Sequence, residues 1–281
     1  MKLDLVFRLS AFLGVLGLMA LWEVLAPRRH LSTTKFPRWA ANLSIVALDS
    51  VIIRLLFGAG ALGAALVVSE RDWGVWNHLS WPTWLEFILA IVVLDFVLYV
   101  QHVMFHAVPW FWRFHMVHHA DLDCDVTTGL RFHPLEVALS MVIKLGAVAL
   151  IGPSPSAVLV FEIVLNATSM FNHSNVRMPT AIDRVLRWFL VTPDMHRIHH
   201  STDPTETNSN FGFNLPWWDR LMGTYRHSPI RGHAGMNIGL EQFRDPRRLT
   251  FGRILLLPFL GTPGRYALLQ RKWSINERGE P

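Results

Sequence analysis

Histidines in this chain stand at spacings that bring imidazole rings onto one side of a helix. The pattern His-x-x-His-His occurs twice, and a His-x-x-x-His pair precedes the first copy: His102 and His106, then His115, His118 and His119, then His196, His199 and His200. Residues three or four positions apart share one face of an α-helix. Neutral imidazole binds iron, zinc, copper and nickel, so three such faces predict a metal site.

The number of these patterns argues against coincidence. Fourteen of the 281 residues are histidine, so a chain of this length is expected to contain about 0.035 copies of His-x-x-His-His by chance. Two copies and the upstream pair far exceed that expectation, and a histidine-rich basic surface patch is the weaker interpretation. The histidines that fit no ligand spacing are expected at the surface; they are His30, His78, His227 and His233.

Eight imidazoles exceed what one ion needs, since a zinc site normally takes four ligands. They predict two neighbouring ions. An all-imidazole shell leaves each ion its full positive charge, and open coordination positions can bind dioxygen. A structural zinc site would instead be closed and rich in cysteine. This chain has one cysteine, Cys124, and no His-Glu-x-x-His motif of the zinc proteases.

The elements that position these residues are predicted to be membrane helices. Hydrophobic residues make up 51% of the chain and charged residues 17%, against about 25% charged residues in an ordinary soluble domain. The formal net charge is +5, but the basic residues cluster beside apolar runs. Lipid head groups and membrane topology explain that placement better than nucleic acid does.

Five apolar segments approach the roughly 20 residues that cross a bilayer; they cover about 5–26, 41–68, 84–106, 135–151 and 155–172. The sequence Gly152-Pro153-Ser154-Pro155 joins the last two and predicts a short helical hairpin. We therefore predict an all-α integral membrane protein with about four to five membrane helices and a cytoplasmic, histidine-rich helical cap. Three regions are expected: N-terminal helices and loops at 1–82, a histidine-box catalytic domain at 83–230 that includes the third to fifth segments, and a cytoplasmic or interfacial tail at 231–281.

Lysine and arginine in short loops predict the orientation, because they accumulate on the cytoplasmic side. The first loop carries Arg28, Arg29, Lys35 and Arg38, whereas the second has only Arg71. The histidine patterns are therefore expected to face the cytoplasm in a multi-pass protein of a bacterial inner membrane or an endoplasmic-reticulum-type membrane. Two apolar segments separate the two His-x-x-His-His patterns, so both are predicted to end on the same side.

The ordered motifs resemble those of the fatty acid hydroxylase/sterol desaturase superfamily. The resemblance spans about 95–226 and rests on DFVLYVQHVMFH, RFHMVHH, RFHPLE, FNHSN, DMHRIHH and NFGFNLPWWDRLMGTYR. It implies an integral membrane di-metal oxygenase, generally di-iron, that uses dioxygen to hydroxylate or desaturate a lipid C–H bond. It also implies the metal ligands His102, His106, His115, His118, His119, His196, His199 and His200, with His173 of FNHSN as a further ligand.

Two positions leave the implied ligand set open. Some members of the superfamily have a second histidine four residues before the one matched by His173, but this chain has Ser169 there. His133 of RFHPLE is the candidate that would compensate. Its alternative role is to cap the helix that begins at Pro134 or to support a ligand.

Four further residues are candidates to orient the imidazoles: Asp95, Tyr99, Glu136 and Asp194. A ligand histidine usually donates its other N–H to a carboxylate or a carbonyl. For Asp194 the alternative is a favourable negative charge at the start of a helix. Thr192 is expected to cap that helix, with Pro193 in its first turn.

The predicted function is hydroxylation of a fatty-acyl or sterol-like lipid by an iron-dependent enzyme. The same cage also suits a lipid desaturase or a sterol methyl oxidase, and a non-catalytic membrane protein that binds or transports metal is the alternative from another class. Two iron ions are expected, with zinc as an option in the purified protein, and dioxygen as co-substrate. The sequence has neither a His-Pro-Gly-Gly stretch nor a Gly-rich dinucleotide fingerprint, so electrons are expected from a separate cytochrome- or ferredoxin-like protein.

Overall fold

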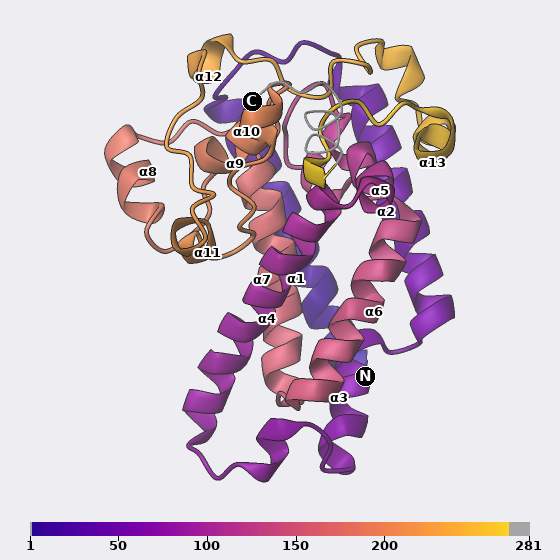
Figure 1. Ribbon diagram of the computed structural model, residues 1–281, viewed down its shortest axis with the longest axis vertical. Coiled ribbons are helices and arrows are strands. Elements are labelled where there is room, and N and C mark those ends of the chain that lie inside the picture. Colours follow the sequence, from indigo (N-terminus) through magenta and orange to yellow (C-terminus); the bar gives the residue numbers. More distant parts are fainter. Residues whose placement is uncertain (1, 270–281) are drawn as a thin grey trace, which may run out of the picture.

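The computed structural model describes residues 2–269, so the last part of the predicted tail, 270–281, lies outside the described residues. Helices build the described chain, and extended segments meet in it only as isolated bridges (Figure 1). The longer helices are α1 (Lys2–Leu25), α2 (Lys35–Phe57), α3 (Gly60–Glu70), α4 (Thr83–Ala107), α5 (Pro109–His119), α6 (Pro134–Ile151), α7 (Pro155–His173) and α13 (Phe251–Leu260). The shorter ones are η1 (Val75–His78), η2 (Thr128–Leu130), α8 (Thr180–Leu186), α9 (Pro193–His199), α10 (Pro204–Thr207), α11 (Trp217–Leu221), α12 (Gly232–Gly235) and η3 (Pro246–Arg248).

Four apolar stretches of the described chain are long enough to cross a membrane: Val6–Leu25, Lys35–His78, Thr83–Ala107 and Pro134–Ile151. They confirm the prediction of an all-α multi-pass membrane protein. The helix α7 falls outside this set because Glu162, Asn166 and Asn172 make it more polar. It packs against α1 and α4 and thereby turns part of its surface inward.

The second predicted membrane segment is divided in the structure. The helix α2 ends at Phe57, and Gly58 and Gly60 adopt positive φ angles of 57° and 61°. Glycine reaches such angles at little cost because it has no Cβ, so the chain changes direction here before α3. The helix α3 then packs against α6 and α7 and buries Ala61 and Ala65.

The helices α6 and α7 form the predicted hairpin. Gly152 ends α6 in the left-handed conformation, with φ at 77°, where glycine is strongly preferred. The Ser154 hydroxyl accepts a hydrogen bond from the Ala157 backbone N–H at 3.4 Å and caps α7, and Pro155 occupies the first turn. The sequence Gly152-Pro153-Ser154-Pro155 therefore contains the end of one helix and the start of the next.

The short helices α8–α12 gather with α5 at one end of the long helices and form a cap (Figure 1). The C-terminal segment belongs to this cap, because Ile254 and Leu257 of α13 lie in a buried cluster with Trp112 of α5. The Trp112 indole N–H also donates to the Pro263 carbonyl at 2.8 Å. The end of the described chain is thereby tied to the helix that carries the first His-x-x-His-His pattern.

One buried arginine ties α2 to the loop that follows α5. The Arg38 guanidinium donates to the two carboxylate oxygens of Asp121 at 2.6 and 2.9 Å and to Asp125 at 2.8 Å. Burial opposes the ionisation of Asp121, but the guanidinium outweighs it and lowers the pKa of Asp121 below the ordinary value of 3.8. Bidentate arginine–carboxylate pairs are strong and directional, so this Arg38 clamp fixes the chain just after His119.

Candidate metal centre

Nine histidine side chains converge in two groups that could each hold a metal ion. The first group contains His102, His106, His115, His119 and His199, and the second contains His118, His173, His196 and His200. Within each group, one ring nitrogen per residue lies within 4.8 Å of the others, and every residue is buried. The structure therefore brings together all eight pattern histidines and His173.

The two groups divide each His-x-x-His-His pattern between them. The residues four apart enter the same group, as His115 with His119 and His196 with His200, whereas the middle histidine joins the other group. A helix turns about 100° per residue, so a step of four returns to within about 40° of the start and a step of three falls about 60° to the other side. One such pattern can therefore serve two neighbouring ions.

Contacts between ring nitrogens fit ligands that share an ion. Nε2 of His173 lies 3.0 Å from Nε2 of both His118 and His196. The corresponding distance between His102 and His115 is 3.1 Å. Imidazole nitrogens lie about 2.1 Å from a bound zinc ion, so two of them at a right angle would be about 3.0 Å apart.

Other ring nitrogens of the two groups are buried without a hydrogen-bond partner among the described residues. They are both nitrogens of His119 and His200, Nε2 of His106 and His199, and Nδ1 of His196. Buried polar atoms are normally paired. A set of unpaired imidazole nitrogens of this size is therefore a good fit to metal ligation.

Six of the nine rings are oriented through Nδ1, which leaves Nε2 for a metal. The oxygen partners are the Phe211 carbonyl for His102 (2.7 Å), the Asn208 side chain for His106 (3.3 Å), Glu136 for His115 (2.6 Å), and the carbonyls of Arg131 for His118 (3.1 Å), Ser169 for His173 (2.7 Å) and Ser209 for His199 (2.8 Å). A proton donated from Nδ1 fixes the tautomer and makes Nε2 a better ligand.

Burial also keeps the imidazoles of the cap neutral. It lowers the pKa of His118, His119 and His199 well below 6.5, and neighbouring imidazoles lower it further. For His115, burial lowers the pKa to about 3. The neutral ring is the form that binds a metal, so these side chains are ready to act as ligands at neutral pH.

Glu136 contacts a proposed ligand directly. Its Oε1 accepts the Nδ1 proton of His115 at 2.6 Å, and both side chains are buried. We expect Glu136→Gln to weaken metal binding about tenfold or more, because a neutral amide supports the ring less than a carboxylate does. Titration of the purified protein against a competing chelator measures this affinity.

The control for this prediction is Glu86→Gln, since Glu86 accepts a hydrogen bond from the Ser154 backbone N–H at the hairpin turn. That variant should bind metal like the unmodified chain. Equal metal affinities in the two variants would show that Glu136 does not support a ligand.

Asp95 and Tyr99 hold a loop and make no hydrogen bond to the proposed ligands. Asp95 accepts hydrogen bonds from the Trp218 indole at 2.8 Å and from two backbone N–H groups of the same loop. The Tyr99 hydroxyl lies 2.9 Å from Oγ1 of Thr224. Both side chains therefore hold the 210–226 segment in place. The Phe211 carbonyl of this segment accepts a hydrogen bond from His102.

Asp194 binds arginines rather than imidazole ligands. Its carboxylate accepts a hydrogen bond from Arg28 at 3.0 Å and pairs with Arg197. The residue lies in the first turn of α9, where the Thr192 hydroxyl caps the helix and Pro193 follows. The predicted cap and first turn are confirmed, and Asp194 links α9 to the loop after α1.

Asp219 helps to position the candidate metal centre, and the sequence did not indicate this role. It is buried and accepts hydrogen bonds from the backbone N–H groups of Phe211 and Gly212 at 2.7 and 2.9 Å and from the Thr224 hydroxyl at 2.7 Å. These bonds place the Phe211 carbonyl that orients His102. The only signal in the sequence was one acidic residue within an aromatic stretch.

His133 lies outside both groups. Its Nδ1 accepts a hydrogen bond from the Leu135 backbone N–H at 3.2 Å, and its Nε2 lies 3.2 Å from the Leu255 carbonyl oxygen. Both ring nitrogens have partners, and the side chain caps α6. We therefore leave His133 out of the proposed ligand set.

Ser169, at the position where some superfamily members have histidine, is part of a tight contact between α7 and η2. Its hydroxyl donates to the Gly129 carbonyl at 2.8 Å, and its own carbonyl accepts from His173. A Cβ atom at Gly129 would lie 2.4 Å from the Ser169 carbonyl oxygen. Only glycine allows the two segments to approach this closely.

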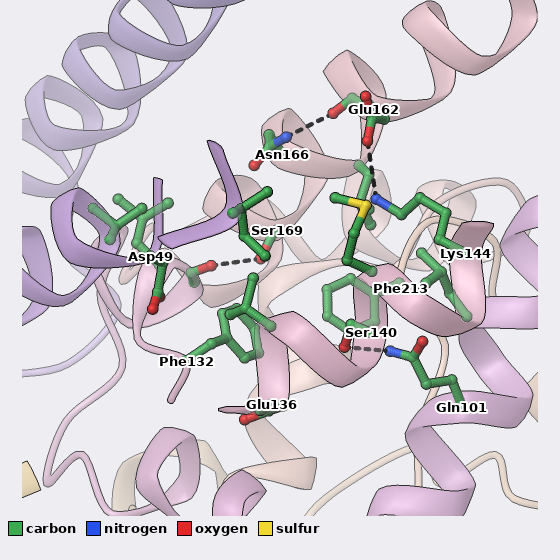
Figure 2. A pocket seen from close by; sticks show the side chains of 18 of the residues that line it. Asp49, Gln101, Phe132, Glu136, Ser140, Lys144, Glu162, Asn166, Ser169 and Phe213 are labelled. Carbon is green, nitrogen blue, oxygen red and sulfur yellow. Dashed lines mark hydrogen bonds and ion pairs between the residues drawn. The ribbon is translucent and has the colours of Figure 1, made fainter. Parts of the chain in front are cut away.

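A cavity of about 340 Å³ begins at the first histidine group and extends between α2, α4, α6 and α7. His102 and His115 form part of its wall, beside the rings of Phe105, Phe132 and Phe213. Figure 2 shows that polar side chains also line it, among them residues of α6 and α7. The cavity offers an apolar chain a place next to two proposed ligands.

Comparison with known proteins gives an independent result. The family model for fatty acid hydroxylases matches residues 87–224, the region that holds all nine converging histidines. Ornithine lipid hydroxylase of Rhizobium tropici is 27% identical over 223 residues, which are 78% of this chain and 66% of that protein. Alkylglycerol monooxygenase of Xenopus tropicalis is 29% identical over 202 residues, which are 68% of this chain and 43% of that protein.

Human cholesterol 25-hydroxylase is 26% identical over 148 residues, which are 51% of this chain and 52% of that protein. The matches therefore span between 43% and 66% of the lengths of these relatives. No solved structure matches the chain.

Proposed function

Because this chain belongs to the fatty acid hydroxylase/sterol desaturase superfamily, we propose that it is a membrane-bound di-iron oxygenase that hydroxylates a lipid C–H bond with dioxygen and external electrons. The relatives are a lipid hydroxylase, a monooxygenase and a sterol hydroxylase by name. The observation that carries the proposal is the pair of adjacent buried imidazole groups, the first of which lines one end of a cavity with phenylalanine rings and polar side chains in its wall.

Two bound iron ions would supply the activation of dioxygen that oxidation of an unactivated C–H bond requires. The chain itself supplies the ligands and their orientation. Neutral imidazoles hold positive ions without cancelling their charge, and the carbonyl partners of His102, His118 and His173 keep those rings in place. We propose that residues 83–230 form the catalytic domain.

The cavity walls place the substrate and exclude water. An apolar chain that follows the cavity meets His102 and His115, and the phenyl rings of Phe105 and Phe132 cover the same end. Exclusion of water limits side reactions of strongly oxidising species. A lipid can enter such a site from the bilayer without passing through water.

We further propose that a separate cytochrome- or ferredoxin-like protein delivers electrons to the cap, and that the cap faces the cytoplasm. Exposed arginines on the cap support both ideas; they include Arg177, Arg184, Arg247 and Arg248. Basic residues accumulate on the cytoplasmic side of membrane proteins, and a basic surface attracts an acidic partner.

The proposal is tested with the purified, iron-loaded protein, membrane lipids, a reductant and dioxygen labelled with oxygen-18. Mass spectrometry of the lipids should detect an alcohol that carries a single labelled oxygen atom. Removal of iron with a chelator should abolish this product, and addition of iron should restore it.

Other outcomes would point to the alternatives. An unsaturated lipid without the label would identify a desaturase. Iron that remains bound while no dioxygen is consumed would contradict the proposal and favour a non-catalytic metal-binding protein.

A further inference from the structure

A second cavity, of about 570 Å³, lies between α1, α2 and α7. It shares five lining residues with the first cavity: Arg8, Val46, Ser50, Glu162 and Asn166. Leu9 and Leu13 of α1 line it and are more than half exposed. The two cavities therefore adjoin, one beside α1 and the other reaching the first histidine group.

A charged cluster stands where the two cavities meet. Glu162 of α7 accepts a hydrogen bond from the Lys144 ammonium of α6 at 3.1 Å, and its other oxygen lies 2.9 Å from the Arg8 guanidinium of α1. Figure 2 shows Lys144 and Glu162 pointing toward each other in the first cavity. We call these three residues the Arg8–Glu162–Lys144 cluster.

The charge balance of the cluster argues for a role beyond holding helices together. Ionisable side chains inside an apolar bundle are costly and usually mark a binding site or a pathway. Two cations contact the buried Glu162, so the cluster itself carries one positive charge in excess, although the Arg8 side chain is 36% exposed. Among the described residues, the other carboxylates of the first cavity, Asp49 and Glu136, form no ion pair with Arg8 or Lys144. The Lys144 ammonium has three N–H donors, and Glu162 takes one of them.

We propose that the Arg8–Glu162–Lys144 cluster binds the anionic end group of the lipid substrate, a carboxylate or a phosphate monoanion. The spare donors of Lys144 and Arg8 suit an oxygen-rich anion, since charge-assisted hydrogen bonds are the strong ones. A plain hydrocarbon end would offer these donors no acceptor. This assignment deepens the proposed oxygenase function and rests on it for the reaction at the other end of the cavity.

The position of the cluster sets the distance between the bound anion and the reacting carbon. Lys144 follows Glu136 by eight residues on α6, and eight residues of helix span about 12 Å. Glu136 contacts the proposed ligand His115. The cluster would therefore hold the anionic group about two helical turns along α6 from the end of the cavity that carries the proposed ligands, and would direct oxidation to a carbon away from that group.

Binding of lipid probes to the purified full-length chain tests the proposal without dioxygen or reductant, so the result does not depend on whether the chain oxidises lipid. The probes are palmitate, 1-hexadecanol as its neutral counterpart of equal chain length, and phosphatidylglycerol. We expect an anionic probe to bind about tenfold or more tightly than 1-hexadecanol. Preference for palmitate would indicate a free fatty acid, and preference for phosphatidylglycerol would indicate a phospholipid.

Charge variants separate recognition from a structural role. Lys144→Met should remove the preference for the anionic probe and leave 1-hexadecanol binding unchanged. Glu162→Gln removes the competing carboxylate and should keep or strengthen anion binding. Arg54→Met is the matched control, because Arg54 is exposed outside both cavities and bonds only the Gly58 carbonyl among the described residues.

Two results would overturn the proposal. One is equal affinity of the unmodified chain for both anionic probes and 1-hexadecanol. The other is an equal loss of binding of all three probes in both Lys144→Met and Glu162→Gln. That result is expected if the ion cluster only holds the helices together.

Discussion

Replacing His118 with alanine is expected to abolish lipid oxidation and to lower the bound metal, while the chain still inserts into membranes. His118 belongs to the second imidazole group, and its Nε2 lies 3.0 Å from Nε2 of His173. Without it that group has three imidazoles, His173, His196 and His200, and would hold an ion less tightly. Metal analysis of the purified variant and the labelled-oxygen assay measure the two effects.

The matched control is His78→Ala. His78 is exposed in η1 and belongs to neither imidazole group. This variant should keep its metal and its activity. Full activity in His118→Ala would remove His118 from the ligand set, and loss of membrane insertion in that variant would mean that the defect is in folding.

Replacing Arg38 with methionine is expected to destabilise the fold by about 3–5 kcal/mol, because the buried carboxylates of Asp121 and Asp125 lose their cation. The guanidinium also donates to the Asp123 carbonyl at 2.8 Å, so the loop after α5 loses several of its bonds to α2 at once. The midpoint of thermal unfolding in detergent should fall by on the order of 10 °C. Metal binding should weaken as well, since the loop follows His119 directly.

The control for the Arg38 clamp is Arg247→Met. Arg247 pairs with Asp245 at 3.0 Å, but its side chain is 86% exposed, and exposed pairs contribute at most about 1 kcal/mol. That variant should melt close to the unmodified chain. An unchanged unfolding midpoint in Arg38→Met would mean that the clamp is not needed for the stability of the loop.

Local patterns in the sequence were sufficient to predict much of the fold. The apolar segments and the Gly-Pro-Ser-Pro turn depend on residues close together in the chain, and the structure has the expected helices and hairpin. The break after Phe57 was not predicted, because Gly58 and Gly60 lie within a continuous apolar run. Only their positive φ angles reveal the turn.

The candidate site shows the same limit. Helical spacing was enough to select eight of the converging histidines, because steps of three and four define a helix face. Spacing also contains the division of the histidines into two groups, because His119 lies four residues after His115 and joins its group, whereas His118 lies three residues after it and joins the other. The sequence analysis did not predict this division.

Partners that lie far away in the chain could not be predicted. Asp95 was expected beside a ligand because it lies on the face of α4 that carries His102, but it binds Trp218, 123 residues away. His102 is oriented by a backbone carbonyl, that of Phe211. Any residue has a carbonyl, so residue type gives no signal for such a contact.

The close approach of Gly129 to Ser169 limits how this centre can change over generations. A side chain at position 129 would push against α7, because a Cβ atom there would lie 2.4 Å from the Ser169 carbonyl oxygen. The same carbonyl accepts the hydrogen bond that orients His173. Any replacement of Gly129 is therefore expected to disturb a proposed ligand of the second group, and descendants of this chain are expected to keep glycine there.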